Sequence, residues 1–474
     1  MANESSPAEG VLGMTHFDAI IVGAGQAGPS LAGRLTGAGM KVALVERKLL
    51  GGTCVNTGCM PAKTLIASAR AAHVARHAER WGVLHDGAVR VDMPRVAARA
   101  RKVTEDARAA LGRWIGDMAG LTLIEGHARL DGPGAVRVGA ERLTAPRIFL
   151  NVGGRAAVPP LPGIDRIPYL TNTSMLALDH LPHHLVVVGG SYIGLEFAQM
   201  YRRFGAAVTV VEKGPRLIPR EDEDVSESIG AILAGEGIAV RTRAECIGFE
   251  PLEGGAAVRV DCEDGAPEVP GSHVLLATGR RPNTDDLGLD TAGVARDERG
   301  FITVDDGLAT NVPGIWAMGD CNGRGAFTHT AYNDFEIVAA NLLDGADRRL
   351  GARVPAYALY IDPPLGRCGM TEGQALASGR PVLVSKRPMA RVGRAVERGE
   401  TDGFMKVVAD AETGRILGAA ILGVEGDEAI HGILDAMHAD LPYPVLRWAV
   451  PIHPTVSELI PTLLEGLAPP PGRR

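Results

Sequence analysis

Two cysteines separated by four residues are the most chemically specific feature of the sequence. Cys54 and Cys59 lie in residues 51–63, GGTCVNTGCMPAK. This spacing lets the two sulfurs close a small disulfide ring. Pro61 is a good first-turn residue, so Cys59 is expected at the start of a helix, where the helix dipole and free N–H groups stabilise a thiolate. Thiol–disulfide exchange needs such an asymmetric pair, in which one sulfur stays a thiolate while the other attacks substrate.

The alternative interpretations of this pair are a structural disulfide and half of a zinc site. Zinc is disfavoured because no second CxxC or CxxH pair supplies the remaining ligands. A purely structural bridge is unusual inside a cytosolic chain. The other cysteines have no partner spacing and are expected to be ordinary residues: Cys246, Cys262, Cys321 and Cys368.

A histidine near the end of the chain is the candidate acid–base group. His453 is followed five residues later by Glu458, a carboxylate that could orient the imidazole. Opening a disulfide releases a thiolate that an imidazolium can protonate, and such help is typically worth about 10²–10⁴-fold in rate. Taken alone, a histidine before proline is more often a structural residue. A second group of histidines is interpreted as solvated residues of a surface linker, so no metal site is expected there: His180, His183 and His184.

The elements that would position these groups begin with a glycine motif directly after an apolar strand. The motif consists of Gly23, Gly25 and Gly28. The strand is predicted at 17–22 and the helix that follows at 26–38. The glycines allow a tight turn, close approach of a pyrophosphate and close helix–strand packing. Glu46 ends the next predicted strand, at 41–46, where it can accept hydrogen bonds from an adenosine ribose.

A second copy of this pattern starts about 165 residues later. Gly189 and Gly194 bracket the motif, Ser191 replaces its middle glycine, and Glu212 ends the following strand. A carboxylate at this point would repel a 2′-phosphate, which favours NADH. Nearby cations, Lys213 and Arg216, leave NADPH open. Two motifs predict two dinucleotides bound by one chain.

Composition limits the classes of function. The 474 residues include 61 glycines and 46% hydrophobic residues, which suits an α/β protein of several domains. A net charge of −7 offers no attraction for nucleic acid or an anionic membrane, and no apolar run is long enough to cross a bilayer. The arginine-rich helix around 95–113 is interpreted as a solvated face. Residues 1–16 are polar, with no apolar leader, and predict a disordered tail and a cytoplasmic protein.

Together these motifs resemble the class I pyridine nucleotide–disulfide oxidoreductases over roughly residues 17–467. Two further segments carry the resemblance: ATGRRPN at 277–283 and GIWAMGD at 314–320. The family implies FAD at the first glycine motif and NADH or NADPH at the second. It also implies α/β architecture, with two Rossmann-like dinucleotide-binding domains and a C-terminal α+β dimerisation domain.

The resemblance assigns roles to individual residues. It makes Cys54 the interchange thiol and Cys59 the charge-transfer thiol, and it pairs Lys63, near flavin N5, with Glu196. Asp320 would hold the ribityl chain, and Tyr192 would cover the flavin until the nicotinamide enters. Further cofactor contacts are assigned to Gly52, Thr53 and Gly279. In the family, the dyad corresponding to His453 and Glu458 reaches the disulfide of the other subunit, which implies a homodimer with shared active sites.

The expected domain division follows from the same pattern. Its segments are a tail (1–16), the first part of the FAD domain (17–155), the NAD(P) domain (156–279), the second part of the FAD domain (280–352) and the dimerisation domain (353–470). In the last domain, antiparallel strands are expected at 382–387, 403–410 and 415–422, and helices at 426–440 and 456–465.

The electron acceptor stays open at this level. Residues 51–63 and 327–334 look most like the mercuric-reductase-like branch, but no cysteine follows Cys368 and no N-terminal CxxC domain is seen. His453 also argues for a sulfur leaving group, because a metal held by two thiolates needs no such proton. Dihydrolipoamide dehydrogenase is the main alternative, and glutathione reductase fits less well. A nucleotide transhydrogenase or redox-signalling flavoprotein would need none of these groups. The candidate acceptors are lipoamide, a small disulfide, Hg(II), Cu(II) and a hypohalous or hypothiocyanous oxidant.

Overall fold

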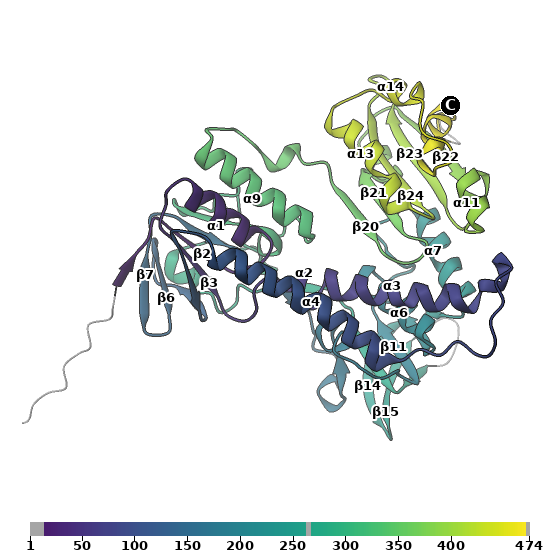
Figure 1. Ribbon diagram of the computed structural model, residues 1–474, viewed down its shortest axis with the longest axis horizontal. Helices are drawn as coiled ribbons and strands as arrows, with labels where there is room; N and C mark the ends of the chain where they lie inside the picture. Colours follow the sequence, from purple (N-terminus) through teal and green to yellow (C-terminus); the bar gives the residue numbers. More distant parts are fainter. Residues whose placement is uncertain (1–13, 262–266, 471–474) are drawn as a thin grey trace, which may run out of the picture. The chain divides into compact units, whose positions relative to one another are not determined.

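The computed structural model describes residues 14–261 and 267–470 (Figure 1). Its chain forms two compact units. Among the described residues, the first comprises 14–61, 101–156 and 280–353, and the second comprises 62–100, 157–261, 267–279 and 354–470. Helices α3 (Cys59–Arg76) and α4 (Met93–Gly116) have residues in both units.

A five-stranded parallel sheet is the centre of the first unit. Its strands, in spatial order, are β19 (Ile315–Ala317), β8 (Ile148–Leu150), β2 (Ala19–Val22), β3 (Val42–Glu46) and β4 (Leu121–Glu125). Strands β2 and β3 are almost continuous apolar runs because both faces of a parallel sheet are covered. Alternate side chains enter different cores, as a two-residue period requires.

Different elements cover the two faces of this sheet. Helices α1 (Ala27–Gly37) and α9 (Thr328–Leu343) pack together on one face (Figure 1). The other face carries a small sheet of β1 (Met14–His16), β7 (Glu141–Thr144), β6 (Ala135–Val138) and β5 (Ala128–Leu130). The remaining elements of the unit are α2 (Gly52–Thr57), β9 (Gly154–Ala156), β18 (Arg280–Pro282), α8 (Leu289–Ala292), a 3₁₀ turn η3 (Gly319–Asn322) and a 3₁₀ turn η4 (Leu350–Ala352).

The second unit repeats this design. Its parallel sheet has the order β10 (Tyr169–Leu170), β17 (His273–Leu276), β11 (His184–Val188), β12 (Ala207–Val211) and β13 (Ala239–Arg241). Helices α6 (Tyr192–Phe204) and α7 (Glu223–Gly235) cover one face. Antiparallel strands cover the other: β14 (Glu245–Leu252), β15 (Gly255–Asp261) and β16 (Glu268–Gly271). Shorter elements are η1 (Ala78–Trp81), η2 (Ile164–Arg166) and α5 (Asn172–Met175).

A five-stranded antiparallel sheet forms the last part of the second unit. Its order is β20 (Ala356–Leu359), β21 (Leu365–Gly369), β24 (Ile416–Leu422), β23 (Phe404–Asp410) and β22 (Val382–Pro388). The surrounding helices are α10 (Glu372–Ala377), η5 (Met389–Arg391), α11 (Gly393–Arg398), α12 (Gly426–Ala429), α13 (His431–His438), α14 (Tyr443–Arg447), η6 (Ser457–Leu459) and α15 (Ile460–Glu465).

These sheets confirm the predicted fold class and the three antiparallel strands. The single helix predicted at 426–440 is wrong in detail, because it is divided into α12 and α13 and ends at His438. Asp440 has a φ of 55°, in the left-handed region that a short polar side chain tolerates, and there the chain turns away. The finer division into FAD and NAD(P) segments stays a prediction.

Candidate active site

The cysteine segment joins two helices end to end. Cys54 lies in α2, half-buried, and Cys59 is the first residue of α3, exposed. Gly58 lies between the helices, and a Cβ there would meet the Thr53 carbonyl oxygen at 2.8 Å. The predicted helix start at Cys59 is therefore confirmed, and it brings the N-terminal end of the helix dipole to this sulfur.

Three polar side chains that sequence reasoning missed support this segment, one from within it and two from other elements. The Asn56 amide donates hydrogen bonds to the carbonyl oxygens of Leu50 (2.8 Å) and Gly52 (2.9 Å). Arg108, from α4, donates to the Asn56 side-chain oxygen at 3.3 Å. Thr328 places its hydroxyl 3.3 Å from Sγ of Cys59. Asn56 lies inside the cysteine motif and could have been found there, whereas Thr328 and Arg108 are brought in only by folding.

The cysteine segment also packs on the first glycine motif. The Gly51 N–H donates to the Ala24 carbonyl at 2.8 Å. Gly52 has a φ of +59°, and a Cβ there would lie 2.9 Å from Cα of Gly25. A side chain at Gly52 would separate the two loops, so glycine is required for their contact. The predicted disulfide segment and the predicted FAD motif are therefore neighbours in the same unit.

The first glycine motif has the close contacts that a dinucleotide loop needs. A Cβ at Gly23 would lie 2.3 Å from the Asn151 carbonyl oxygen, and one at Gly28 would lie 2.2 Å from the Gly23 carbonyl oxygen. Only glycine permits this packing of the helix on the sheet. Glu46 accepts a hydrogen bond from the Ala24 N–H at 2.9 Å, which holds its carboxylate at the loop.

Asp320 lies in the turn that follows β19. Arg280 donates to its carboxylate at 3.3 Å and to the Gly154 carbonyl at 2.7 Å. The buried carboxylate of Asp334 holds the same turn, since it accepts from the Gly319 N–H at 2.8 Å and from Asn322 at 2.9 Å. Asp334 was not singled out from the sequence, although it falls within the segment 327–334.

The second glycine motif repeats the geometry of the first. A Cβ at Gly189 would lie 2.4 Å from the Ala277 carbonyl oxygen, and one at Gly194 would lie 2.0 Å from the Gly189 carbonyl oxygen. Glu212 accepts hydrogen bonds from the N–H groups of Gly190 and Gly214, both at 2.6 Å. In the same unit, Gly279 has a φ of +117° and open space where a Cβ would stand.

These features fit two dinucleotides. Each motif has a glycine turn whose backbone can approach a pyrophosphate and a helix N-terminus that favours its charge. Each strand-end acid, Glu46 or Glu212, uses two of its roughly four acceptor positions on backbone N–H groups, which leaves capacity for ribose hydroxyls.

The predicted pair of Lys63 and Glu196 is present in the second unit. The Lys63 ammonium donates to both carboxylate oxygens, at 2.9 and 2.7 Å. The side chain of Glu196 is 9% exposed and also accepts from the Tyr360 N–H at 3.1 Å. The ring of Tyr360 lies 4.6 Å from the ammonium. Burial makes this pair expensive to break from one side, because the remaining charge would lose its partner.

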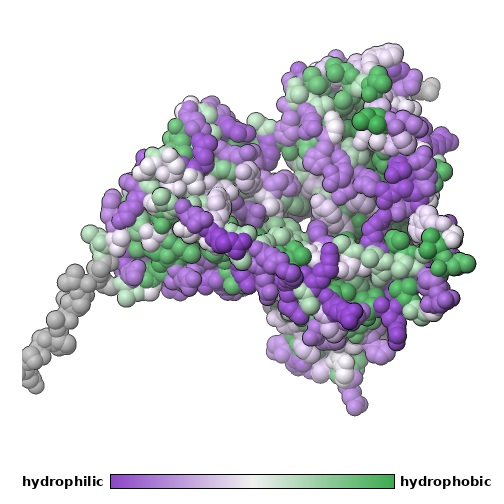
Figure 2. Space-filling model, in the orientation of Figure 1, coloured by the Kyte–Doolittle hydropathy of each residue, from purple (hydrophilic) through white to green (hydrophobic). Residues whose placement is uncertain are grey.

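His453 and Glu458 also form the predicted dyad. Nδ1 of His453 lies 2.8 Å from a Glu458 carboxylate oxygen. The imidazole is 79% exposed, whereas Glu458 is only 14% exposed. Large apolar side chains just before it are also exposed: Trp448 (77%), Val450 (96%) and Ile452 (78%). Figure 2 shows hydrophobic surface over the elements near α14, which precedes this segment.

The other histidines and cysteines stay outside these groups. His184 contacts the Thr209 hydroxyl at 2.9 Å, and His180 lies 3.2 Å from His273 between their Nε2 atoms. Over the described ranges, no cluster of three or more His, Cys, Asp or Glu side chains could hold a metal ion. Burial raises the pKa of both Cys321 and Cys368 to about 12, which disfavours their thiolates. The predictions for Cys246 and Cys262 concern side chains outside the described part.

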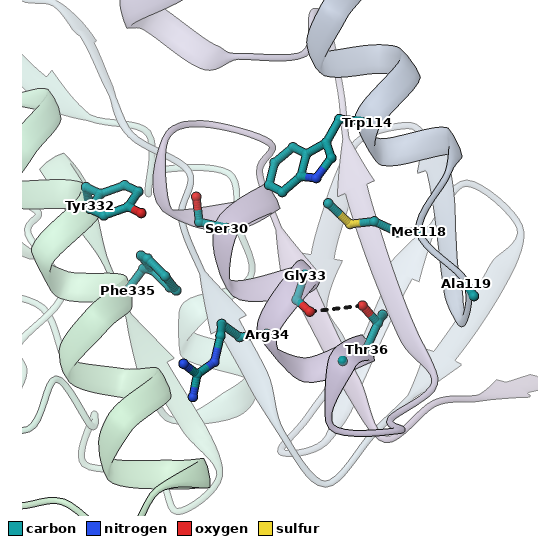
Figure 3. A pocket seen from close by; sticks show the side chains of 10 residues that line it. Ser30, Gly33, Arg34, Thr36, Trp114, Met118, Ala119, Tyr332 and Phe335 are labelled. Atoms are coloured by element: carbon teal, nitrogen blue, oxygen red, sulfur yellow. Dashed lines mark hydrogen bonds between the residues drawn. The ribbon is translucent and has the colours of Figure 1, made fainter.

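A hollow on the first unit is distinct from these groups. Figure 3 shows it beside α1, with Trp114 and Met118 on one side and Tyr332 and Phe335 on the other. Ser30, Gly33 and Arg34 line it between them. The predicted cysteines and motif glycines are not among its lining residues, so it is not a candidate for the active site.

Helices able to cross a membrane are not found in the described part of the chain, since each is too short or too polar.

Comparison with known families gives two matches that together span most of the chain. Residues 17–334 match the model described as pyridine nucleotide-disulphide oxidoreductase. Residues 355–464 match the dimerisation domain of the same group.

Individual relatives align with nearly the full length of this chain. The probable pyridine nucleotide-disulfide oxidoreductase RclA of Escherichia coli strain K12 is 37% identical over 454 residues, covering 94% of this chain and 98% of its own. A mercuric reductase of Bacillus cereus is 33% identical and covers 94% of this chain and 70% of its own. A dihydrolipoyl dehydrogenase of Chlamydia pneumoniae is 33% identical, covering 94% and 95%.

Solved structures show the same similarity. The HOCl-induced flavoprotein disulfide reductase RclA from Escherichia coli matches with a TM-score of 0.86 and 35% identity, covering 94% of this chain and 99% of that one. Its Cu(II) complex matches with the same TM-score of 0.86 and the same identity of 35%. The chain therefore belongs to the pyridine nucleotide-disulphide oxidoreductases, as an FAD-dependent NAD(P)H oxidoreductase that carries the dimerisation domain of this family.

Proposed function

We propose that this protein reduces a small disulfide or another thiol-reactive oxidant with electrons from NADH, through FAD and the Cys54–Cys59 pair. The contact between the cysteine segment and the first glycine motif carries this proposal, because it brings the sulfurs beside the loop expected to bind FAD. When bound, FAD accepts a hydride equivalent from the nicotinamide and delivers two electrons to a disulfide.

The two cysteines divide the exchange chemistry between them. In the reduced pair, Sγ of Cys54 attacks the substrate disulfide, forms a mixed disulfide and releases one thiolate. Sγ of Cys59 then attacks Cys54, which restores the Cys54–Cys59 bond and releases the second substrate sulfur. Two electrons pass to the substrate in total. The position of Cys59 at the start of α3, with the Thr328 hydroxyl 3.3 Å away, supports its role as the stable thiolate.

His453 protonates the leaving sulfur, and Glu458 orients its ring. The 2.8 Å contact between them supports this assignment. We further propose that the protein is a homodimer in which the dyad of one subunit serves the cysteine pair of the other. The exposure of His453, and of Trp448, Val450 and Ile452 near it, supports a surface that a second copy covers.

The remaining assignments follow from the same site. The Lys63–Glu196 pair would lie near the reactive end of the flavin, and Asp320 would hold its ribityl chain. Gly52, Thr53 and Gly279 would contact the cofactors, and Tyr192 would lie at the nicotinamide. The segments 17–155 and 280–352 would form the FAD domain, 156–279 the NAD(P) domain and 353–470 the dimerisation domain. We expect the protein to work in the cytoplasm.

We propose that the protein belongs to the mercuric-reductase-like branch of the family, and this choice limits its electron acceptor. The relative RclA is described as a flavoprotein disulfide reductase induced by HOCl and has a Cu(II) complex, which supports an oxidant or metal-linked acceptor. The alternative function is that of a dihydrolipoamide dehydrogenase, for which lipoamide would be the disulfide acceptor, because a dihydrolipoyl dehydrogenase is 33% identical over nearly the same length. His453 favours a sulfur substrate over Hg(II), since a released thiolate needs a proton.

One variant separates this proposal from a flavoprotein that does not use a disulfide. Cys54→Ser should abolish disulfide turnover while NADH still reduces the flavin. Cys368→Ala, which removes a buried thiol elsewhere, is the control and should keep turnover. Turnover is screened with lipoamide, glutathione disulfide, Hg(II), Cu(II) and hypothiocyanite, using NADH and NADPH in parallel. Full turnover by Cys54→Ser with every acceptor would contradict the disulfide relay.

A further inference from the structure

A buried carboxylate in the second unit joins the nucleotide-binding fold to the antiparallel sheet. Glu221 has a fully buried side chain and precedes α7. Arg367, on β21 and 1% exposed, donates two hydrogen bonds to one of its oxygens, at 2.5 and 3.0 Å. The Tyr357 hydroxyl, on β20, donates to the other oxygen at 2.6 Å. Two strands of the dimerisation domain therefore hold one carboxylate of the preceding domain.

The same carboxylate contacts the second glycine motif. Tyr192 lies inside this motif as the first residue of α6, and its hydroxyl donates to Glu221 at 3.5 Å. Its ring meets the ring of Tyr357 edge-on, with centroids 5.5 Å apart and planes at 88°. Burial and the Glu221 carboxylate raise the pKa of Tyr357 to about 12, so its hydroxyl stays protonated and can donate. Tyr192 is thus held from two sides.

The loop that carries Glu221 also supports the glycine motif directly. The Ile218 N–H donates to the Gly190 carbonyl at 2.9 Å. Ile218 is buried and has a φ of 45°, a left-handed conformation that is rare for a β-branched residue. Such a conformation persists only where the surroundings enforce it. Here the Ser226 hydroxyl donates to the Leu217 carbonyl at 2.7 Å, and the Glu221 N–H donates to the Ile218 carbonyl at 3.0 Å.

We propose that Glu221, held by Tyr357 and Arg367, is a positioning residue for the NAD(P) site. Through it the dimerisation domain sets the position of Tyr192 and of the loop that supports Gly190. This inference rests on the proposed function in taking the second glycine motif as the NAD(P) site. The consequence is that the Tyr357 hydroxyl, on β20, contributes to nucleotide affinity. A site that is already ordered loses less conformational entropy when the nucleotide binds.

Tyr357→Phe is the most informative variant. It removes the hydroxyl that bonds Glu221 and also contacts Tyr192, and it keeps the ring that packs on Tyr192. Truncating Arg367 would instead leave a buried charge without its partner and endanger folding. Tyr443→Phe, in α14 of the same domain, is the matched control because it removes a hydroxyl outside this network. Glu221→Gln is a second variant that keeps the size of the side chain.

The experiment uses the FAD-loaded protein. The affinity for NAD⁺, which cannot reduce the flavin, is measured by calorimetry. Flavin reduction by NADH and reoxidation of the reduced enzyme by its acceptor are followed separately by stopped flow. In Tyr357→Phe, we expect NAD⁺ affinity to fall about three- to tenfold, the net worth of one ordinary hydrogen bond, because the hydroxyl acts on the site through Glu221. Reduction at subsaturating NADH should slow by a similar factor, while reoxidation stays near that of wild type. The melting temperature should fall by only about a few degrees, because Arg367 still holds the Glu221 carboxylate.

Three outcomes would overturn the inference. They are NAD⁺ affinity within twofold of wild type in both Tyr357→Phe and Glu221→Gln, an equal slowing of both half-reactions, or the same loss in Tyr443→Phe. Failure of the proposed function would look different: wild type would bind NAD⁺, but its reduced form would pass no electrons to any disulfide or oxidant.

Discussion

Sγ of Cys59 and the hydroxyl of Thr328 lie 3.3 Å apart, and each residue begins a helix, α3 and α9 respectively. The positive ends of helix dipoles and a hydroxyl donor both stabilise a thiolate. The two residues are separated by 269 positions in the sequence, so the contact depends entirely on the fold of the first unit.

Removing this hydroxyl should make the Cys59 thiolate less stable. In the two-electron-reduced enzyme, Thr328→Val should move the midpoint of the thiolate titration upward by roughly one pH unit, because a hydrogen bond to a charged group is worth about 1.5 kcal/mol. The measurement is the long-wavelength absorbance band of a thiolate beside oxidised flavin, followed against pH. Thr328→Ser keeps the donor and should restore the wild-type midpoint. An unshifted midpoint in Thr328→Val would show that the hydroxyl does not donate to the sulfur.

His453→Gln should slow the reaction of reduced enzyme with a disulfide by roughly 10²–10⁴-fold, since the leaving thiolate loses its acid. Reduction of the flavin by NADH should be unchanged, because it precedes this step. Glu458→Gln, which weakens the 2.8 Å contact with the ring, should give a smaller loss. Stopped-flow measurement of both half-reactions checks this. If His453→Gln slowed flavin reduction by NADH as much as the reaction with disulfide, His453 would not act only in protonating the leaving substrate sulfur.

Mixing two inactive variants tests whether the active site is shared between subunits. Cys54→Ser and His453→Gln are each expected to lack disulfide turnover. After subunit exchange, about half of the dimers are mixed and contain one intact site of two, so about a quarter of wild-type activity should return. Trp448→Glu places a charge on the exposed surface beside His453 and should weaken the dimer in light-scattering measurements. No recovery in the mixture would mean that each subunit holds its own complete site.

Glu212 should determine the choice between NADH and NADPH. Its carboxylate is fixed by two 2.6 Å hydrogen bonds from backbone N–H groups, so it cannot move away from a 2′-phosphate. Glu212→Ala should raise kcat/KM for NADPH relative to NADH by about tenfold, equivalent to ~1.4 kcal/mol. The ratio is the proper readout, because loss of the loop contacts weakens both nucleotides. Glu223→Ala, an exposed acid in the same segment, should leave the ratio unchanged.

His73 should make the fold less stable in mild acid. Burial, together with repulsion from Arg203, lowers the pKa of His73 to about 4. An unfolded histidine titrates near pH 6.5, so between about pH 6.5 and 4 the unfolded state binds a proton that the folded state does not. Stability is therefore expected to fall as pH decreases through this window. His73→Gln should reduce the fall in melting temperature, whereas His85→Gln, at an exposed position, should not.

Local chemistry explains why much of the fold could be predicted. Buried parallel strands such as β2 and β11 are continuous apolar runs, and the glycines after them leave little choice of conformation. Pro61 indicated the start of α3, because proline is favoured in the first turn of a helix. The prediction of one helix at 426–440 was less accurate, because the helix boundaries depend on backbone turns such as the one at Asp440.

The residues of the candidate site also fall into those that could be predicted from the sequence and those that could not. Residues close together in the chain could be paired from their types and spacing, as the 2.8 Å contact of His453 with Glu458 confirms. The pairing of Cys54 with Cys59 stays a prediction. Lys63 and Glu196 were paired through the family resemblance. Asn151, whose amide donates to the Gly23 carbonyl at 3.2 Å, and Glu221 were not found, because each acts on a segment more than twenty positions away and carries no motif of its own. Thr328 lies within the segment 327–334, but its contact with Cys59 was not predicted, because the two residues are 269 positions apart.

The sequence by itself determined the local patterns: two cysteines separated by four residues, two glycine motifs after apolar strands and a histidine followed by a carboxylate. These depend on residue types at short separations, where the backbone geometry is limited. Only the tertiary structure decided what surrounds them, such as the hydroxyl beside Cys59 and the buried Glu221 held by Tyr357 and Arg367. Such contacts arise when separate strands and helices pack into one core, and no local pattern in the chain encodes which side chains will meet there.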